Sequence, residues 1–239
     1  MINAALVLEG GALRSLYTAG VLDVFMENKI EFKCVIGVSA GALCGANYIA
    51  KHIGNSAKIN IIHSGDSNFV GLRQLIVKGS IFNFNYLFYD PIKKLYPYDE
   101  ERLKNSKQKF LIGATDCRTG NVVYFERNNY DDLVHALQAS SSMPLLSKIV
   151  NIDGMECLDG AIADPISLHK AFSEGYNKVI IILTRDSDYR KQDPSSLHKL
   201  LFKVYEKKYP KLIATMRKRP HYYNLLMEEI NSLEKNKKS

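Results

Sequence analysis

Short apolar runs alternate with longer amphipathic stretches over the first 50 residues of the chain. Residues 4–8 (AALVL) and 32–38 (FKCVIGV) predict buried strands, and residues 15–28 (SLYTAGVLDVFMEN) predict a helix. Small residues after Ser39 predict a second helix that packs closely against a neighbour. A strand, helix, strand, helix order is typical of an α/β fold, a central, mostly parallel sheet flanked by helices in three layers.

The rest of the chain continues this alternation. Further strands are predicted at residues 109–116, 121–127 and 178–184, and Arg118-Thr119-Gly120 supplies a turn between the first two. Helices are predicted at residues 131–140, 195–209 and 221–235. Pro210 and Pro220 are expected to separate helical segments, because proline cannot donate a backbone hydrogen bond.

Composition and charge indicate one globular domain with a basic end. The chain has 239 residues, of which 46% are hydrophobic and 24% charged. Residues 190–239 hold 13 Lys/Arg and 5 Asp/Glu, a net charge of +8, against +7 for the whole chain. We therefore expect a catalytic domain at residues 1–189 and a basic helical extension at 190–239 packed on the same domain. The extension is either a solvated helical face or a peripheral contact with an anionic membrane.

The compartment and the binding classes follow from features that the sequence lacks. The start MINAALVLEGG has no basic region followed by a long apolar run, so a cytoplasmic protein is expected. The four cysteines have no metal-ligand spacing, which predicts reduced structural thiols and no metal or cofactor. Residues 1–189 are nearly neutral, so a nucleic-acid partner is not expected. The oligomeric state is left open.

The stretch GVSAG at residues 37–41 has the pattern of a nucleophile elbow. Ser39 lies between a predicted strand and a predicted helix, where a sharp turn exposes its hydroxyl. Gly37 and Gly41 stand two residues before and after it, where the turn leaves no room for a side chain. The alternative is a tight turn whose serine only caps the helix.

A second candidate is LEGGALRS at residues 8–15, between the first strand and the first helix. Backbone N–H groups at Gly10 and Gly11 can converge on a developing oxyanion, and Arg14 adds positive charge nearby. A phosphate site is the weaker interpretation, since neither nucleotide-binding glycine pattern is present.

The base that would activate Ser39 is less obvious. His169, His198 and His221 follow the serine, but none lies in a loop of catalytic character. Asp159, in CLDGAIADP, stands at the end of an apolar stretch, where its carboxylate can project into a cleft. An Asp-Gly pair is also a common turn, so this motif is weak by itself.

Taken in order, LVLEGGALRSLYTAGVLDVF, VIGVSAGAL and LDGAIADP resemble the patatin-like phospholipase family. The resemblance implies a fold related to cytosolic phospholipase A2 and a Ser-Asp dyad made of Ser39 and Asp159. The glycine-rich oxyanion motif of the family falls on Gly10, Gly11, Ala12, Leu13, Arg14 and Ser15. Ala12 and Ser15 replace glycines of that motif, and at Ala12 a positive φ would be strained.

The resemblance implies a hydrolase that cleaves carboxylic esters of phospholipids or related lipids through an acyl-serine, without a cofactor. Two alternatives stay open: an acyltransferase using the same dyad, and a lipid-binding or regulatory protein of weak activity. The aromatic segment 81–98 is either irregular core packing or a wall over an apolar substrate. The segment ASSSMP at 139–144 either borders the cleft or ends a helix.

Overall fold

The computed structural model describes residues 1–63, 66–67, 71–78, 80, 83, 100–127, 132–195 and 202–236. The aromatic segment 81–98 lies outside the described residues except for Asn83. Of the predicted helix at 195–209, the described residues 202–206 are helical.

Seven strands form one mixed sheet in the order β5-β6-β3-β2-β1-β7, with β4 also paired to β3. Four strands are parallel to one another: β1 (Ile2–Leu8), β2 (Phe32–Val38), β3 (Lys109–Asp116) and β7 (Val179–Ile182). The other three strands make the antiparallel pairs β3–β4, β3–β6 and β5–β6: β4 (Val122–Glu126), β5 (Val150–Ile152) and β6 (Met155–Asp159). The predicted α/β class with a central sheet is confirmed.

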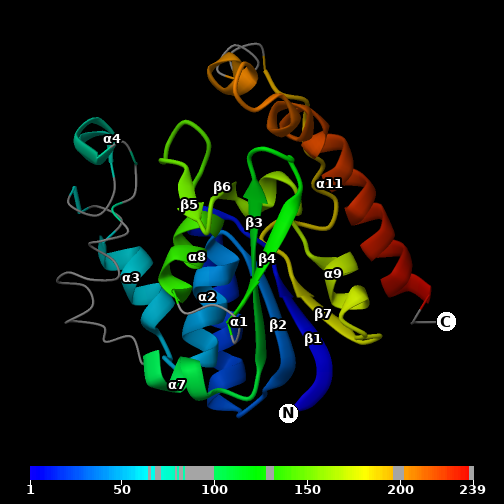
Figure 1. The fold of residues 1–239 in the computed structure, drawn as a ribbon. Coiled ribbons are helices and arrows are strands. Elements are labelled where there is room, and N and C mark those ends of the chain that lie inside the picture. Colours follow the sequence, from blue (N-terminus) through cyan, green and yellow to red (C-terminus); the bar gives the residue numbers. More distant parts are fainter. Residues whose placement is uncertain are drawn as a thin grey trace.

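Helices cover both faces of the sheet (Figure 1). One face carries α1 (Ser15–Glu27), α2 (Ala40–Ile49) and α8 (Leu133–Ser140), with α3 (Asn55–His63), α4 (Leu72–Lys78) and α7 (Glu100–Asn105) further out. The other face carries α9 (Leu168–Ser173) and α11 (Pro210–Asn236). The result is a three-layer arrangement of helices, sheet and helices.

The alternation of side chains along β1 explains why the strand is apolar throughout. Leu6 and Leu8 join the core beneath α1, α2 and α8, whereas Ala5 and Val7 join the core beneath α9 and α11. Successive residues of a strand point to opposite faces, and a parallel sheet covered on both faces buries them all. The continuous apolar run AALVL is therefore what this position requires.

Pro220 does not separate two helices, contrary to expectation, because it lies inside α11. An interior proline removes one helical hydrogen bond and costs about 3 kcal/mol. Both halves of α11 are anchored by packing: Met216 lies in a core cluster with Leu158, and Tyr223 lies in another with Ile36. Tertiary contacts on either side of Pro220 therefore hold the helix together. Pro210 does mark a boundary, since α11 begins there.

A hairpin of β5 and β6 occupies residues 150–159, where the sequence pattern predicted no strand. Asp153 and Gly154 both have positive φ, of 51° and 84°, which is the conformation of a two-residue type I′ turn. This hairpin carries Asp159 to the centre of the sheet.

Candidate active site

The pairing of β3 shows how two strands bring the predicted site residues together. Residues 111–113 of β3 pair with both β2 and β4, so these two strands lie on opposite edges of β3. Residues 114 and 115 pair with both β4 and β6. Since a strand has only two edges, β6 must lie on the same edge of β3 as β2, directly beyond its end.

The two strands approach each other end to end on that edge. The last residue of β2, Val38, pairs with Gly113, and the last residue of β6, Asp159, pairs with the next residue, Ala114. Ser39 follows Val38 immediately, so β3 sets its distance from Asp159. The Ser39 hydroxyl donates a hydrogen bond of 2.7 Å to Oδ2 of Asp159.

Ser39 has the backbone conformation of a nucleophile elbow, with φ of 54° and ψ of −133°. A side chain is strained there, and such strain is typical of residues held in place for function. A Cβ at Gly37 would lie 2.7 Å from Cα of Ala42, and one at Gly41 would lie 2.4 Å from the carbonyl oxygen of Leu8. The two glycines are therefore needed for the close approach of β2, α2 and β1 around Ser39.

Asp159 is held rigidly and has one oxygen left for Ser39. Its Oδ1 accepts the N–H of Ala161 at 2.8 Å, and its backbone carbonyl accepts the hydroxyl of Thr115 at 2.8 Å. A Cβ on Gly160 would lie 2.1 Å from the carbonyl oxygen of Gly113. The Asp-Gly pair is thus required by contact with β3 and is more than a turn.

Burial raises the pKa of Asp159 above its ordinary value of 3.8. Only 6% of the residue is exposed, so the charged form loses most of its hydration. Hydrogen bonds from Ser39 and Ala161 and the positive charges of Arg219 and Lys191 act in the opposite direction and lower its pKa. The balance makes the carboxylate a stronger base than one in water.

Ser140 at the end of α8 connects the elbow to β3. Its hydroxyl accepts the backbone N–H of Ser39 at 2.8 Å and donates to the carbonyl oxygen of Gly113 at 2.6 Å. Ser140 is fully buried. Both interpretations of residues 139–144 therefore hold, because the segment ends α8 and also borders the candidate site.

The glycine-rich loop lies against the nucleophile. A Cβ on Gly10 would be 2.8 Å from Cβ of Ser39 and 3.6 Å from its Oγ, and a Cβ on Gly11 would be 2.6 Å from Oγ1 of Thr184. Among the described residues, no hydrogen bond uses the backbone N–H groups of Gly10, Gly11 or Ala12. Three free donors therefore lie in the loop beside Ser39.

Ala12 occupies the strained conformation, with φ of 47°. A Cβ in the left-handed region costs about 1–2 kcal/mol. The hydroxyl of Ser15 donates to the carbonyl oxygen of Ala12 at 2.6 Å. The two departures from the family motif thus contact each other, and Ser15 stabilises the turn in which Ala12 is strained. Arg14 is exposed beside them.

Comparison with known proteins identifies the family of this chain. The family model described as patatin-like phospholipase matches residues 6–172, which is more than half of the chain. The chain belongs to the patatin-like phospholipase family. An uncharacterized protein of Escherichia coli (strain K12), YjjU, is 29% identical over 189 residues, 75% of this chain and 51% of that protein. The chain therefore spans about half the length of this relative.

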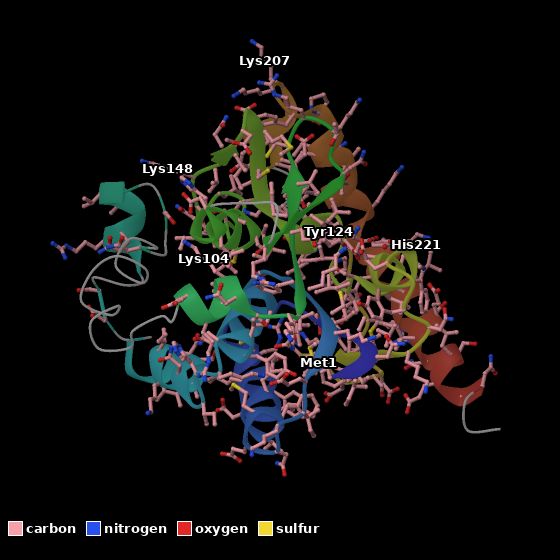
Figure 2. The ribbon with its side chains drawn as sticks, turned by 60° about the horizontal axis from the view of Figure 1, so that its bottom comes forward. Met1, Lys104, Tyr124, Lys148, Lys207 and His221 are labelled. Carbon is pink, nitrogen blue, oxygen red and sulfur yellow. The ribbon has the colours of Figure 1, made fainter. Side chains whose placement is uncertain are left out.

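Among the described residues, neither His169 nor His221 is hydrogen-bonded to Ser39 or Asp159. His169 pairs with Glu229 at 3.0 Å on the surface, His221 is exposed on α11 (Figure 2), and His198 is outside the described residues. In the described ranges, none of the helices combines the length and the hydropathy needed to cross a bilayer.

Three residues that brace the loop of this patatin-like site were not predicted from the sequence. Glu9, 4% exposed, accepts the N–H and the hydroxyl of Thr184 at 2.6 and 3.0 Å, and it accepts the hydroxyl of Tyr223 at 3.1 Å. The signal available for Glu9 was a charged residue between a fully apolar strand and two glycines. Nothing local marks Thr184 or Tyr223, because they are 175 and 214 residues away along the chain.

Proposed function

We propose that this protein is a serine hydrolase that cleaves carboxylic esters of phospholipids or related lipids through an acyl-enzyme. Ser39 is the nucleophile and Asp159 the general base. The observation that carries the proposal is the 2.7 Å hydrogen bond from Ser39 Oγ to Asp159 Oδ2, made by a serine in the elbow conformation.

In the first half-reaction, Ser39 Oγ attacks the ester carbonyl carbon while its proton moves to Asp159 Oδ2. The carbonyl electron pair moves onto oxygen, and the free N–H groups of Gly10, Gly11 and Ala12 are the candidate donors to this oxyanion. When the carbonyl forms again, the bond to the alcohol breaks. The alcohol leaves with the proton from Asp159, and Ser39 is acylated.

In the second half-reaction, water attacks the acyl-serine carbonyl and gives its proton to Asp159. The carbon–oxygen bond to Ser39 breaks, the fatty acid is released, and Ser39 Oγ takes the proton back. The carboxylate acts as base in both halves without a histidine because burial raises its pKa and because an oxyanion site lowers the barrier.

We propose that the basic extension brings the enzyme to anionic lipid surfaces. Its exposed side chains include Lys203, Lys207, Lys211 and Lys218, and Lys207 projects away from the body (Figure 2). Each basic residue near an anionic membrane contributes about 1 kcal/mol. Sedimentation with vesicles containing 30% phosphatidylserine, at low and at 0.5 M salt, tests this proposal. Binding at low salt should weaken at 0.5 M salt, and binding that salt does not weaken excludes electrostatic attraction by the extension.

The dyad is tested by labelling with a fluorophosphonate and by hydrolysis of p-nitrophenyl butyrate. Wild type is expected to label and turn over, Ser39→Ala and Asp159→Asn to lose at least 99% of activity, and His169→Ala to retain it. Loss of activity in folded His169→Ala would restore a triad. A folded wild type that neither labels nor turns over would favour a lipid-binding protein. Acyl transfer to an added alcohol would identify the acyltransferase.

A further inference from the structure

A group of basic side chains surrounds Tyr223, on the α11 side of the candidate active site. The Lys191 ammonium lies 4.2 Å from the ring centroid of Tyr223, whose hydroxyl donates to Glu9 at 3.1 Å. Arg219 is four residues before Tyr223 on α11, so the two side chains share one face of the helix. Lys191 and Arg219 are therefore both near Tyr223, which contacts Glu9 at the start of the glycine-rich loop.

Arg185 and Arg14 complete the group. The Arg185 guanidinium carbon lies 4.2 Å from the ring centroid of Tyr189, and this ring lies 6.0 Å from that of Tyr223. Arg14 belongs to the glycine-rich loop and is exposed. Four cations from three separate parts of the chain thus lie near one another, and the charges of the three arginines act on Lys191.

The cations are poorly compensated. Burial and the charges of Arg219, Arg14 and Arg185 lower the pKa of Lys191 to about 7. Among the described residues that act most strongly on Lys191, Glu9 alone carries a negative charge, and it already accepts from Thr184 and Tyr223. Asp159 is the other carboxylate on which Lys191 and Arg219 act, and it accepts from Ser39, so four cations face two carboxylates that already have partners.

Arg219 has a donor without a partner. Its Nε is buried and makes no hydrogen bond within the described residues. A buried donor without a partner costs about 1–3 kcal/mol, and like charges held together in low dielectric repel. The repulsion falls when an anion binds this guanidinium, and the cost of the unpaired donor falls when the anion accepts from Nε itself. The unpaired Nε and the excess of positive charge thus point to the same ligand chemistry.

Tyr223 connects the group to the dyad, because its hydroxyl donates to Glu9 at 3.1 Å and a Cβ on the next residue, Gly10, would lie 2.8 Å from Cβ of Ser39. The charges of Arg219 and Lys191 act on Asp159 and lower its pKa. An anion held between them would therefore lie within electrostatic range of the carboxylate that faces Ser39.

We propose that Lys191 and Arg219, with Arg14 at the rim, form a subsite for an anionic oxygen group, phosphate or carboxylate, of the ester substrate. The proposal rests on the function proposed above and assigns the basic extension a direct part in substrate selection. Arginine binds such groups through paired N–H donors, and lysine adds a compact charge.

The test compares substrates that differ only in the anionic group. For phosphate, 1-acylglycerol 3-phosphate is compared with 1-acylglycerol; for carboxylate, mono-p-nitrophenyl glutarate is compared with p-nitrophenyl butyrate. The readout is the ratio of kcat/KM for the anionic over the neutral ester. Arg219→Gln and Lys191→Met are expected to lower this ratio at least tenfold for the preferred anion. Lys33→Gln, at an exposed lysine of β2 outside the basic extension with the same loss of charge, should leave it within twofold.

A binding measurement separates the subsite from the chemistry. In Ser39→Ala, 10 mM inorganic phosphate is expected to raise Tm, and adding Arg219→Gln should abolish the rise. The subsite is refuted if Arg219→Gln leaves both ratios unchanged, or if Lys33→Gln lowers them equally. If folded wild type cleaves neither neutral ester, the proposed function fails instead, and the phosphate measurement alone decides the subsite.

Discussion

Gly10→Ala places a methyl group directly against the nucleophile. The new Cβ would lie 2.8 Å from Cβ of Ser39 and 3.0 Å from the carbonyl oxygen of Val38. Carbon atoms in contact normally lie about 3.5 Å apart or more. The glycine-rich loop or the elbow must therefore move by about 0.7 Å. Neither neighbour is the end of a flexible side chain that could turn away.

The size of the effect follows from this displacement. A misplacement of about 1 Å costs about 100-fold in rate, so we expect kcat/KM to fall by about 30–100-fold. Overpacking costs about 1–3 kcal/mol of stability. For a chain of this size each kcal/mol lowers Tm by about 2–4 °C. The variant should therefore remain folded and be assayable at 25 °C.

The assay is hydrolysis of p-nitrophenyl butyrate, with Tm measured by circular dichroism. Gly20→Ala is the matched control: Gly20 lies in α1, and no atom lies within 4 Å of its added Cβ. Alanine there should stabilise the protein by about 0.5–1 kcal/mol and leave kcat/KM unchanged. If Gly10→Ala keeps more than a third of wild-type activity, the loop does not lie against Ser39 as described.

Three further variants test the backbone strain at Ala12, the buried carboxylate of Asp159 and the hydrogen bonds of Ser140. Ala12→Gly should stabilise the protein by about 0.5–1 kcal/mol in thermal unfolding, the relief of left-handed strain less the greater freedom of the unfolded chain, and Lys29→Gly, at φ of 54°, should gain as much. Asp159→Asn should be inactive yet more stable than wild type at pH 7 in urea unfolding, because it removes a buried charge. Ser140→Ala should lower kcat about tenfold and stability by about 1–3 kcal/mol, measured by hydrolysis and urea unfolding, by leaving the N–H of Ser39 and the carbonyl of Gly113 unpaired.

The pH dependence gives the Asp159→Asn prediction its sign. Because the folded protein raises the pKa of Asp159, its stabilising contribution is full below the ordinary value of 3.8 and is lost as pH rises through the folded pKa. The advantage of Asp159→Asn should therefore grow between pH 4 and 7, and a constant difference contradicts it. Wild-type kcat/KM should fall on acidification through that same raised pKa. A loss of stability in Ala12→Gly would contradict the prediction of strain at Ala12, and a normal kcat in Ser140→Ala would contradict the role given to Ser140.

Local pattern was sufficient where the structure depends on neighbours in the sequence. The apolar runs of β1, β2, β3 and β7 were readable because a strand buried on both faces must be apolar throughout. All four cysteines are buried and unpaired, as expected from their spacing. The pattern failed at Pro220, because its two flanking halves of α11 pack into separate clusters of distant residues. The domain division at residue 190 stays a prediction.

At the candidate site the same distinction separates what was readable from what was not. Ser39 and its two glycines form one continuous stretch, so local crowding alone predicts the elbow. Asp159 was identified through a motif, but its distance from Ser39 depends on β2 and β6 sharing one edge of β3. This arrangement depends on the β5–β6 hairpin, and the pattern of apolar residues does not predict how that hairpin is oriented against β3. Glu9 shows the limit most clearly: it holds the glycine-rich loop through Tyr223 of α11. The glycine-rich loop and the basic extension are therefore coupled by contacts between distant residues that the pattern of either segment alone does not show.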